Sequence, residues 1–168
     1  MKKNNSVKMI IIDILILIIA VLADQFVKIA VTCLKGKSSK VLINGVLEFY
    51  YHENKGAAFG ILNGQRVFFI LMAVVVLLVI LYFIMKLPAE KKYIKLNIAL
   101  TFVLAGAIGN TIDRISLGYV RDFIYFSIID FPIFNVADMY ITVSTFLIII
   151  MILFCYKEAD LEFLGNKK

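Results

Sequence analysis

The 168-residue sequence has little of what a disulfide-stabilised domain or a zinc protein needs. It contains two cysteines and one histidine, which leaves little for a disulfide framework or a metal site. Charged residues make up only 18% of the chain, against about 25% in soluble domains, whereas hydrophobic residues reach 62%. This composition argues against a soluble globular enzyme, a disordered chain and a nucleic-acid-binding module.

Long apolar runs are what the sequence does contain. A helix that crosses a bilayer needs about 20 mostly apolar residues. The sequence predicts such helices over residues 9–31, 67–86, 94–113 and 138–156. The first run also resembles a signal peptide with cleavage near Ala23, but its apolar character resumes beyond that point. We therefore predict an all-α membrane protein with four transmembrane helices, folded as a single multi-pass domain over residues 1–168.

Two long segments connect these helices on one side of the membrane, residues 34–66 and 114–137. Long connections in a compact protein are usually functional. Apolar runs flank Asn44 and Gly45, a strong signal for a β-hairpin. We expect a small extracytoplasmic β-element between the first two helices, lying on the membrane surface.

The distribution of basic residues predicts the orientation. The net charge is +6, which fits basic loops at an anionic membrane surface. The side that holds both termini carries ten Lys and Arg residues in short segments, against eight on the other side. Because basic residues close to a span favour the cytoplasm, we expect cytoplasmic termini and outer segments 34–66 and 114–137.

Carboxylates at the ends of three predicted helices indicate where chemistry could occur. Asp24, Asp113 and Asp138 share one depth on the outer side and could converge. Two carboxylates in one site cannot easily both ionise, so such a pair can activate a water and protonate a leaving amine. The helix dipoles favour an ionised Asp138 as the base and a protonated Asp113 as the acid.

Each of these polar residues also has a structural explanation. Asp13 lies on about the same helical face as Asp24, which fits a polar position facing the bundle. The remaining structural alternatives are a helix N-cap at Asn135 with Asp138, an ion pair of Asp113 with Arg114, and an i, i+4 pair of Asp24 with Lys28.

Five blocks of the sequence resemble the lipoprotein signal peptidases (signal peptidase II), the bacterial membrane aspartic peptidases. They are residues 24–28 (DQFVK), 54–60 (NKGAAFG), 106–114 (GAIGNTIDR), 118–124 (GYVRDFI) and 134–138 (FNVAD). In this order and spacing the five blocks extend over residues 24–138, which is most of the chain. Arg121 departs from the pattern, because the family more often has an apolar residue before Asp122.

The resemblance implies a protein of the bacterial cytoplasmic membrane with its active site at the outer leaflet. It would cut the signal peptide from a prolipoprotein just before the diacylglyceryl-modified cysteine. Membrane lipid, and peptide antibiotics of the globomycin type at the active site, are further implied partners; we expect no metal, cofactor or nucleic acid. The implied catalytic dyad falls on Asp113 and Asp138. The implied substrate-binding or supporting residues are Asp24, Lys28, Asn54, Gly56, Ala58, Asn110, Arg114, Asp122, Asn135 and Ala137.

Two other functions remain open from the residues alone. A proton- or ion-coupled transporter would use intramembrane carboxylates, but it predicts carboxylates near mid-membrane and repeat symmetry. A non-enzymatic membrane scaffold would need neither Asp113 nor Asp138.

Overall fold

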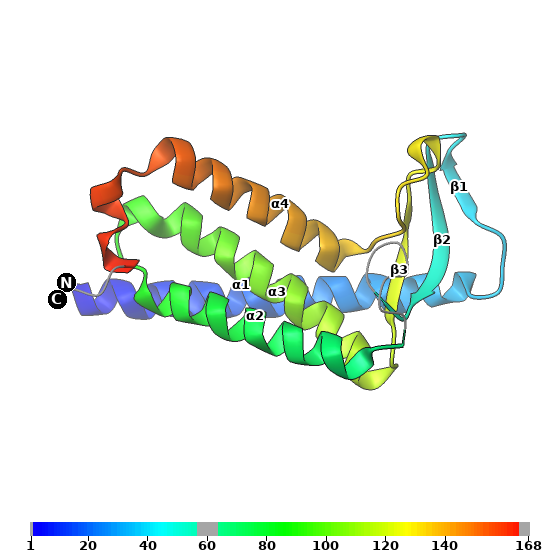
Figure 1. Ribbon diagram of the computed structural model, residues 1–168, viewed down its shortest axis with the longest axis horizontal. Helices are drawn as coiled ribbons and strands as arrows, with labels where there is room; N and C mark the ends of the chain where they lie inside the picture. Colours follow the sequence, from blue (N-terminus) through cyan, green and yellow to red (C-terminus); the bar gives the residue numbers. More distant parts are fainter. Residues whose placement is uncertain (1, 57–63, 165–168) are drawn as a thin grey trace.

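A bundle of four long helices carries a small sheet across one of its ends (Figure 1). The computed structural model describes residues 2–56 and 64–164. The long helices are α1 (Lys2–Ala30), α2 (Arg66–Lys86), α3 (Ile94–Ser116) and α4 (Val136–Ile150). The shorter helical turns are η1 (Val31–Leu34), η3 (Lys91–Tyr93), η4 (Ser127–Ile129), the π-helical η5 (Met151–Cys155), η6 (Glu158–Asp160) and η7 (Glu162–Leu164).

All four long helices are long and apolar enough to cross a membrane. The candidate spans are Ser6–Leu34, Arg66–Lys86, Lys91–Ser116 and Val136–Cys155. This confirms the predicted fold class, and the chain is a multi-pass membrane protein.

Helix α3 is the central helix of the bundle and packs against α1, α2 and α4. Its small residues permit the close approach, since a Cβ on Gly106 would lie 2.4 Å from the carbonyl oxygen of Ala137. Small residues at such contacts are typical of membrane helices, which gain little from hydrophobic burial against lipid. The polar residues of α3 are therefore buried within the bundle, facing α1 and α4.

The predicted hairpin is present. Strand β1 (Lys40–Ile43) pairs with β2 (Leu47–Asn54) in antiparallel register, and Gly45 in the turn has φ of 68°. That left-handed backbone favours glycine, as the Asn-Gly signal requires. A third strand, β3 (Val120–Tyr125), pairs antiparallel with β2 and was not predicted. The sheet thus joins both long connecting segments and brings residues 120–125 to the end of the bundle.

The opposite end of the bundle holds the start of α1 together with η7 (Figure 1). There the ring of Tyr93 stacks on that of Tyr156 with centroids 5.6 Å apart, and its hydroxyl donates to the carbonyl oxygen of Asp160 at 2.8 Å. Cys33 and Cys155 are both free thiols, as their positions at opposite ends of the bundle predict.

Candidate active site

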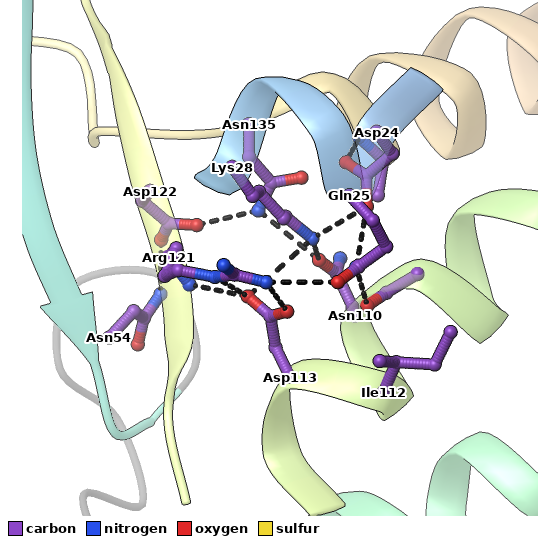
Figure 2. Close-up of polar contacts among 12 residues, drawn as sticks. Asp24, Gln25, Lys28, Asn54, Asn110, Ile112, Asp113, Arg121, Asp122 and Asn135 are labelled. Carbon is purple, nitrogen blue, oxygen red and sulfur yellow. Dashed lines mark hydrogen bonds and ion pairs between the residues drawn. The ribbon is translucent and has the colours of Figure 1, made fainter. Parts of the chain in front are cut away.

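A buried polar network lies where the sheet meets the helices (Figure 2). It draws side chains from α1, α3, β2, β3 and the start of α4. Four carboxylates take part: Asp24, Asp113, Asp122 and Asp138. The first three are almost completely buried, and Asp138 is partly buried and held by hydrogen bonds. The convergence expected for three carboxylates therefore includes a fourth, from β3.

Asp24 and Lys28 form the part of the network contributed by α1. Their side chains are fully buried and make an ion pair of 2.9 Å, the i, i+4 arrangement considered from the sequence. The second Asp24 oxygen accepts the backbone N–H of Ala137 at 2.9 Å. Lys28 also donates to the Asn110 side-chain oxygen at 2.9 Å. Helix α1 is thereby tied to both α3 and α4.

Asn110 and Asn135 link the carboxylates to one another. The Asn110 amide donates to Asp138 Oδ1 at 2.7 Å, and its oxygen accepts from the Asn135 amide at 3.2 Å. The Asn135 amide also donates to Asp122 Oδ1 at 2.6 Å. Asp122 and Asp138 are thus joined through two amide side chains.

Asp138 occupies the first turn of α4. Asn135 is the N-cap of that helix, and the two residues form a reciprocal capping box. The Asn135 oxygen accepts the Asp138 N–H at 3.1 Å, and Asp138 Oδ2 accepts the Asn135 N–H at 3.1 Å. The N-cap explanation from the sequence is therefore correct. It is compatible with chemistry, because the hydrogen bonds from Asn135 and Asn110 fix the Asp138 carboxylate at the start of α4.

Asp122 is buried, and no cation in the described part of the chain forms an ion pair with it. Its second oxygen accepts the Asn54 side-chain amide at 2.8 Å, and Asn54 is in turn held by the Gly56 N–H at 2.9 Å. Among the ion pairs of residues 2–56 and 64–164, none involves Asp122. Burial, followed by the nearby charge of Asp138, raises the pKa of Asp122 from 3.8 to about 7. A carboxyl with that pKa can hold or release a proton at neutral pH.

Asp113 has the opposite environment. Arg121 binds both of its oxygens, through Nη2 at 2.6 Å and Nε at 3.0 Å, and the Arg121 backbone N–H adds a third bond at 3.0 Å. Lys28 Nζ lies 3.9 Å from the same carboxylate. In the described part of the chain no hydrogen bond joins Asp113 to Asp138. Asp113 is therefore a charge-compensated anchor for β3.

The other predicted residues are placed as follows. Arg114 does not form an ion pair with Asp113 in the described structure; its guanidinium lies over the Phe69 ring, 5.0 Å from the centroid, between α3 and α2. Ala137 is completely buried and contributes its backbone N–H to Asp24. Ala58 lies outside the described residues.

Two residues of the network were not among the predicted site residues. Gln25 donates to Asp24 and to the Gly109 carbonyl, and its oxygen accepts from Arg121 at 2.9 Å. Gln25 follows Asp24 in the first sequence block, which was the available signal for it. Arg121 was noticed only as a departure from a family pattern.

The family model described as Signal peptidase (SPase) II matches residues 16–154. A lipoprotein signal peptidase of Caldanaerobacter subterraneus is 43% identical over 143 residues, covering 84% of this chain and 95% of that protein. One from Staphylococcus aureus is 42% identical over 144 residues, covering 84% and 87%. A solved structure titled as a bacterial membrane enzyme has a TM-score of 0.71 at 36% identity, covering 86% of this chain and 94% of its own.

Four membrane-crossing helices and a buried cluster of carboxylates define an integral membrane protein with groups suited to acid–base hydrolysis. With the comparisons, the chain belongs to the signal peptidase II family of lipoprotein signal peptidases. It is a peptidase that removes signal peptides from prolipoproteins. The transporter alternative is not favoured.

Proposed function

We propose that this enzyme cuts the peptide bond just before the diacylglyceryl-modified cysteine of a prolipoprotein, and that Asp122 and Asp138 are its acid–base pair. The observation that carries the assignment is the burial of Asp122 without an ion pair in the described part of the chain, together with its link to Asp138 through Asn135 and Asn110. The sequence favoured Asp113 as the partner of Asp138. The contacts of Asp113 with Arg121 favour a supporting role for it instead.

The chemistry requires one protonated and one ionised carboxyl group. Asp138 takes a proton from a water molecule, and the water oxygen bonds to the peptide carbonyl carbon. The Asp122 proton passes to the carbonyl oxygen. When the carbon–nitrogen bond breaks, the leaving nitrogen takes the proton held by Asp138 and the new carboxyl group returns one to Asp122. The pKa of about 7 at Asp122 suits a proton donor at neutral pH.

The remaining polar residues would hold this pair in place. Asn110 and Asn135 orient the two carboxylates, and Asn54 with Gly56 supports Asp122 from β2. Asp24, Lys28 and the Ala137 N–H fix the start of α4. Arg114 supplies positive charge near the pair. Ala58 is proposed as a substrate contact on the resemblance alone.

We further propose that both termini are cytoplasmic and that the site faces the outer leaflet of the bacterial cytoplasmic membrane. The basic-residue distribution supports this orientation. A substrate held in that leaflet by its acyl chains would present the scissile bond at the interface. Lipid is then a natural contact of the enzyme, and a globomycin-type peptide would compete for the same site.

The test compares Asp113→Asn, Asp122→Asn and Asp138→Asn, purified in detergent, on a lipidated precursor peptide and its unlipidated equivalent. We expect Asp122→Asn and Asp138→Asn to lose turnover by about 10²–10⁴-fold while remaining folded. Asp113→Asn should retain measurable turnover, and the unlipidated peptide should have a much lower kcat/KM. An active Asp122→Asn with an inactive Asp113→Asn would instead support the Asp113–Asp138 dyad.

A further inference from the structure

Arg121 is the residue through which strand β3 is attached to helix α3. Its backbone N–H bond to Asp113 would form with any residue except proline at this position. The two side-chain bonds to Asp113 and the third to Gln25 require a guanidinium. Figure 2 shows that group lying between Asp113 of α3 and Gln25 of α1. The side chain thus joins three elements at a point next to Asp122.

The position of Asp122 depends on this attachment. Asp122 follows Arg121 directly in β3, and its carboxylate reaches the Asn135 amide at the start of α4. A strand held by a bidentate ion pair one residue away has little freedom to shift that carboxylate. Small displacements of reacting groups cost large factors in rate.

The charged side chains around Asp122 and Asp138 also indicate a role for Arg121. The cations facing it come from three elements: Lys28 on α1, Arg114 on α3 and Arg121 on β3. The carboxylates facing it are Asp24, Asp113, Asp122 and Asp138. Three cations balance the site when one of the four carboxylates carries a proton. Asp113 and Asp24 are each ion-paired, so the remaining proton belongs to Asp122 and Asp138.

We propose that Arg121 is a positioning residue that fixes β3 on α3 and, by neutralising Asp113, leaves one proton to be shared by Asp122 and Asp138. This inference rests on the proposed acid–base pair. Arg121 acts through Asp113 and through the backbone of β3.

The experiment separates charge from geometry with three variants. In Arg121→Met the backbone bond to Asp113 is kept but the charge and the side-chain bonds are lost. In Arg121→Lys the charge is kept without the planar fork. In Arg121→Met with Asp113→Asn the unpaired carboxylate is removed as well. Lys35→Met is the matched control, because Lys35 is an exposed lysine whose ion pair is with Glu53 of the same sheet.

We expect Arg121→Met to lower kcat at least about tenfold with little change in KM, and to move the whole pH profile of kcat/KM to higher pH. The direction follows because an uncompensated negative charge favours protonation of its neighbours. At an effective dielectric constant of about 20, an uncompensated unit charge within the same buried network should shift the profile by on the order of one pH unit. Arg121→Lys should lose rate without moving the profile. The double variant should return the profile to its wild-type position, and Lys35→Met should match the wild type.

A wild-type kcat and pH profile in Arg121→Met would overturn the proposal. A double variant whose profile stays displaced would also overturn it, because the effect would then not pass through Asp113. Thermal unfolding of each variant identifies any loss of fold, and the double variant removes the unpaired buried charge that would cause it. If Asp122→Asn is active, the proposed acid–base pair itself has failed. If Asp122→Asn is inactive and Arg121→Met is indistinguishable from wild type, only the role of Arg121 has failed.

Discussion

The Asp24 carboxylate accepts the backbone N–H of Ala137 at 2.9 Å, across 113 positions of the chain. Its other oxygen is paired with Lys28, one turn further along α1. The N-terminus of α4, which carries Asp138, is therefore positioned by a residue of α1 that is itself held by a buried cation. The geometry of the acid–base pair depends on this contact as well as on the strand that carries Asp122.

Removing either partner of the Asp24–Lys28 pair should destabilise the protein strongly. Asp24→Ala leaves a buried ammonium and the Ala137 N–H without an acceptor, at a cost of about 3–5 kcal/mol. Lys28→Met leaves a buried carboxylate. We expect the double variant to be more stable than the sum of the single effects predicts, with a coupling of about 1–3 kcal/mol. Thermal unfolding in detergent measures it, and strictly additive effects would show that the pair does not act as a unit.

Gly106 should not tolerate a methyl group. A Cβ at this position would lie 2.4 Å from the Ala137 carbonyl oxygen and 2.7 Å from Cγ1 of Ile141. Gly106→Ala must push α4 away from α3, which costs about 1–3 kcal/mol and displaces Asp138. We expect kcat to fall about 10–100-fold. Ile112→Ala, at an exposed position of the same helix, is the control and should keep its activity. Equal kcat in both variants would contradict the close-packing argument.

The helices and the first hairpin could be predicted because their signals are local. Apolar length defines a membrane span, and Asn44 with Gly45 defines a turn, whatever the rest of the chain does. Strand β3 could not be predicted in the same way. It pairs with β2 from a distant part of the chain, and Arg121 with Asp122 interrupts its apolar pattern. Those two charged residues are buried only because the helix bundle supplies their partners.

The sequence predicted that the carboxylates converge, but it predicted less well which residues contact them. Arg114 follows Asp113 directly, which suggested an ion pair. Adjacent side chains on a helix do not face each other, however, and Arg114 lies over Phe69 instead. The cation that reaches Asp113 comes from β3, a position that becomes close only when the sheet forms. By contrast, the Asn135–Asp138 cap and the Asp24–Lys28 pair use short spacings and were predicted correctly.

Asp13 should contribute to stability and not to catalysis. Its carboxylate accepts hydrogen bonds from the Asn97 amide at 2.5 Å and the Thr101 hydroxyl at 3.4 Å, which joins α1 to α3. Eleven residues of helix place it about 16 Å from Asp24. Asp13→Ala should cost about 1–3 kcal/mol, because the buried Asn97 amide loses its acceptor. Asp13→Asn keeps an acceptor and should cost less. Both should keep kcat within about twofold, and a large loss of turnover would place Asp13 in the mechanism.

Replacing Asn135 by aspartate should leave the protein folded but greatly reduce its activity. An aspartate at this position still caps α4 by accepting the Asp138 N–H. It cannot donate to Asp122, whose oxygen lies 2.6 Å from the Asn135 amide, and it adds a negative charge there. We expect Asn135→Asp to lose turnover about 100-fold, with its optimum moved to higher pH. Asn135→Ala should unfold at a lower temperature, because the cap is worth about 1 kcal/mol. Wild-type turnover in Asn135→Asp would contradict the proposed role of that hydrogen bond.

The raised pKa of Asp122 makes the stability of the protein depend on pH in a definite direction. In the unfolded chain this carboxyl has a pKa of about 3.9, whereas burial and the charge of Asp138 raise it to about 7 in the fold. The folded state therefore holds the proton more tightly. The stabilisation is complete below about pH 4, declines as the pH rises, and is lost above about pH 7, with a slope of at most about 1.4 kcal/mol per pH unit.

Asp122→Asn removes this dependence of stability on pH. Unfolding temperatures of the two proteins measured from about pH 4.5 to about pH 8.5 should diverge up to about pH 7 in favour of Asp122→Asn and then run parallel. Asp130→Asn, at an exposed carboxylate near the same sheet, should follow the wild type throughout. A constant difference between Asp122→Asn and the wild type across this range would mean that Asp122 does not hold a proton at neutral pH, and its assignment as the acid of the pair would fail.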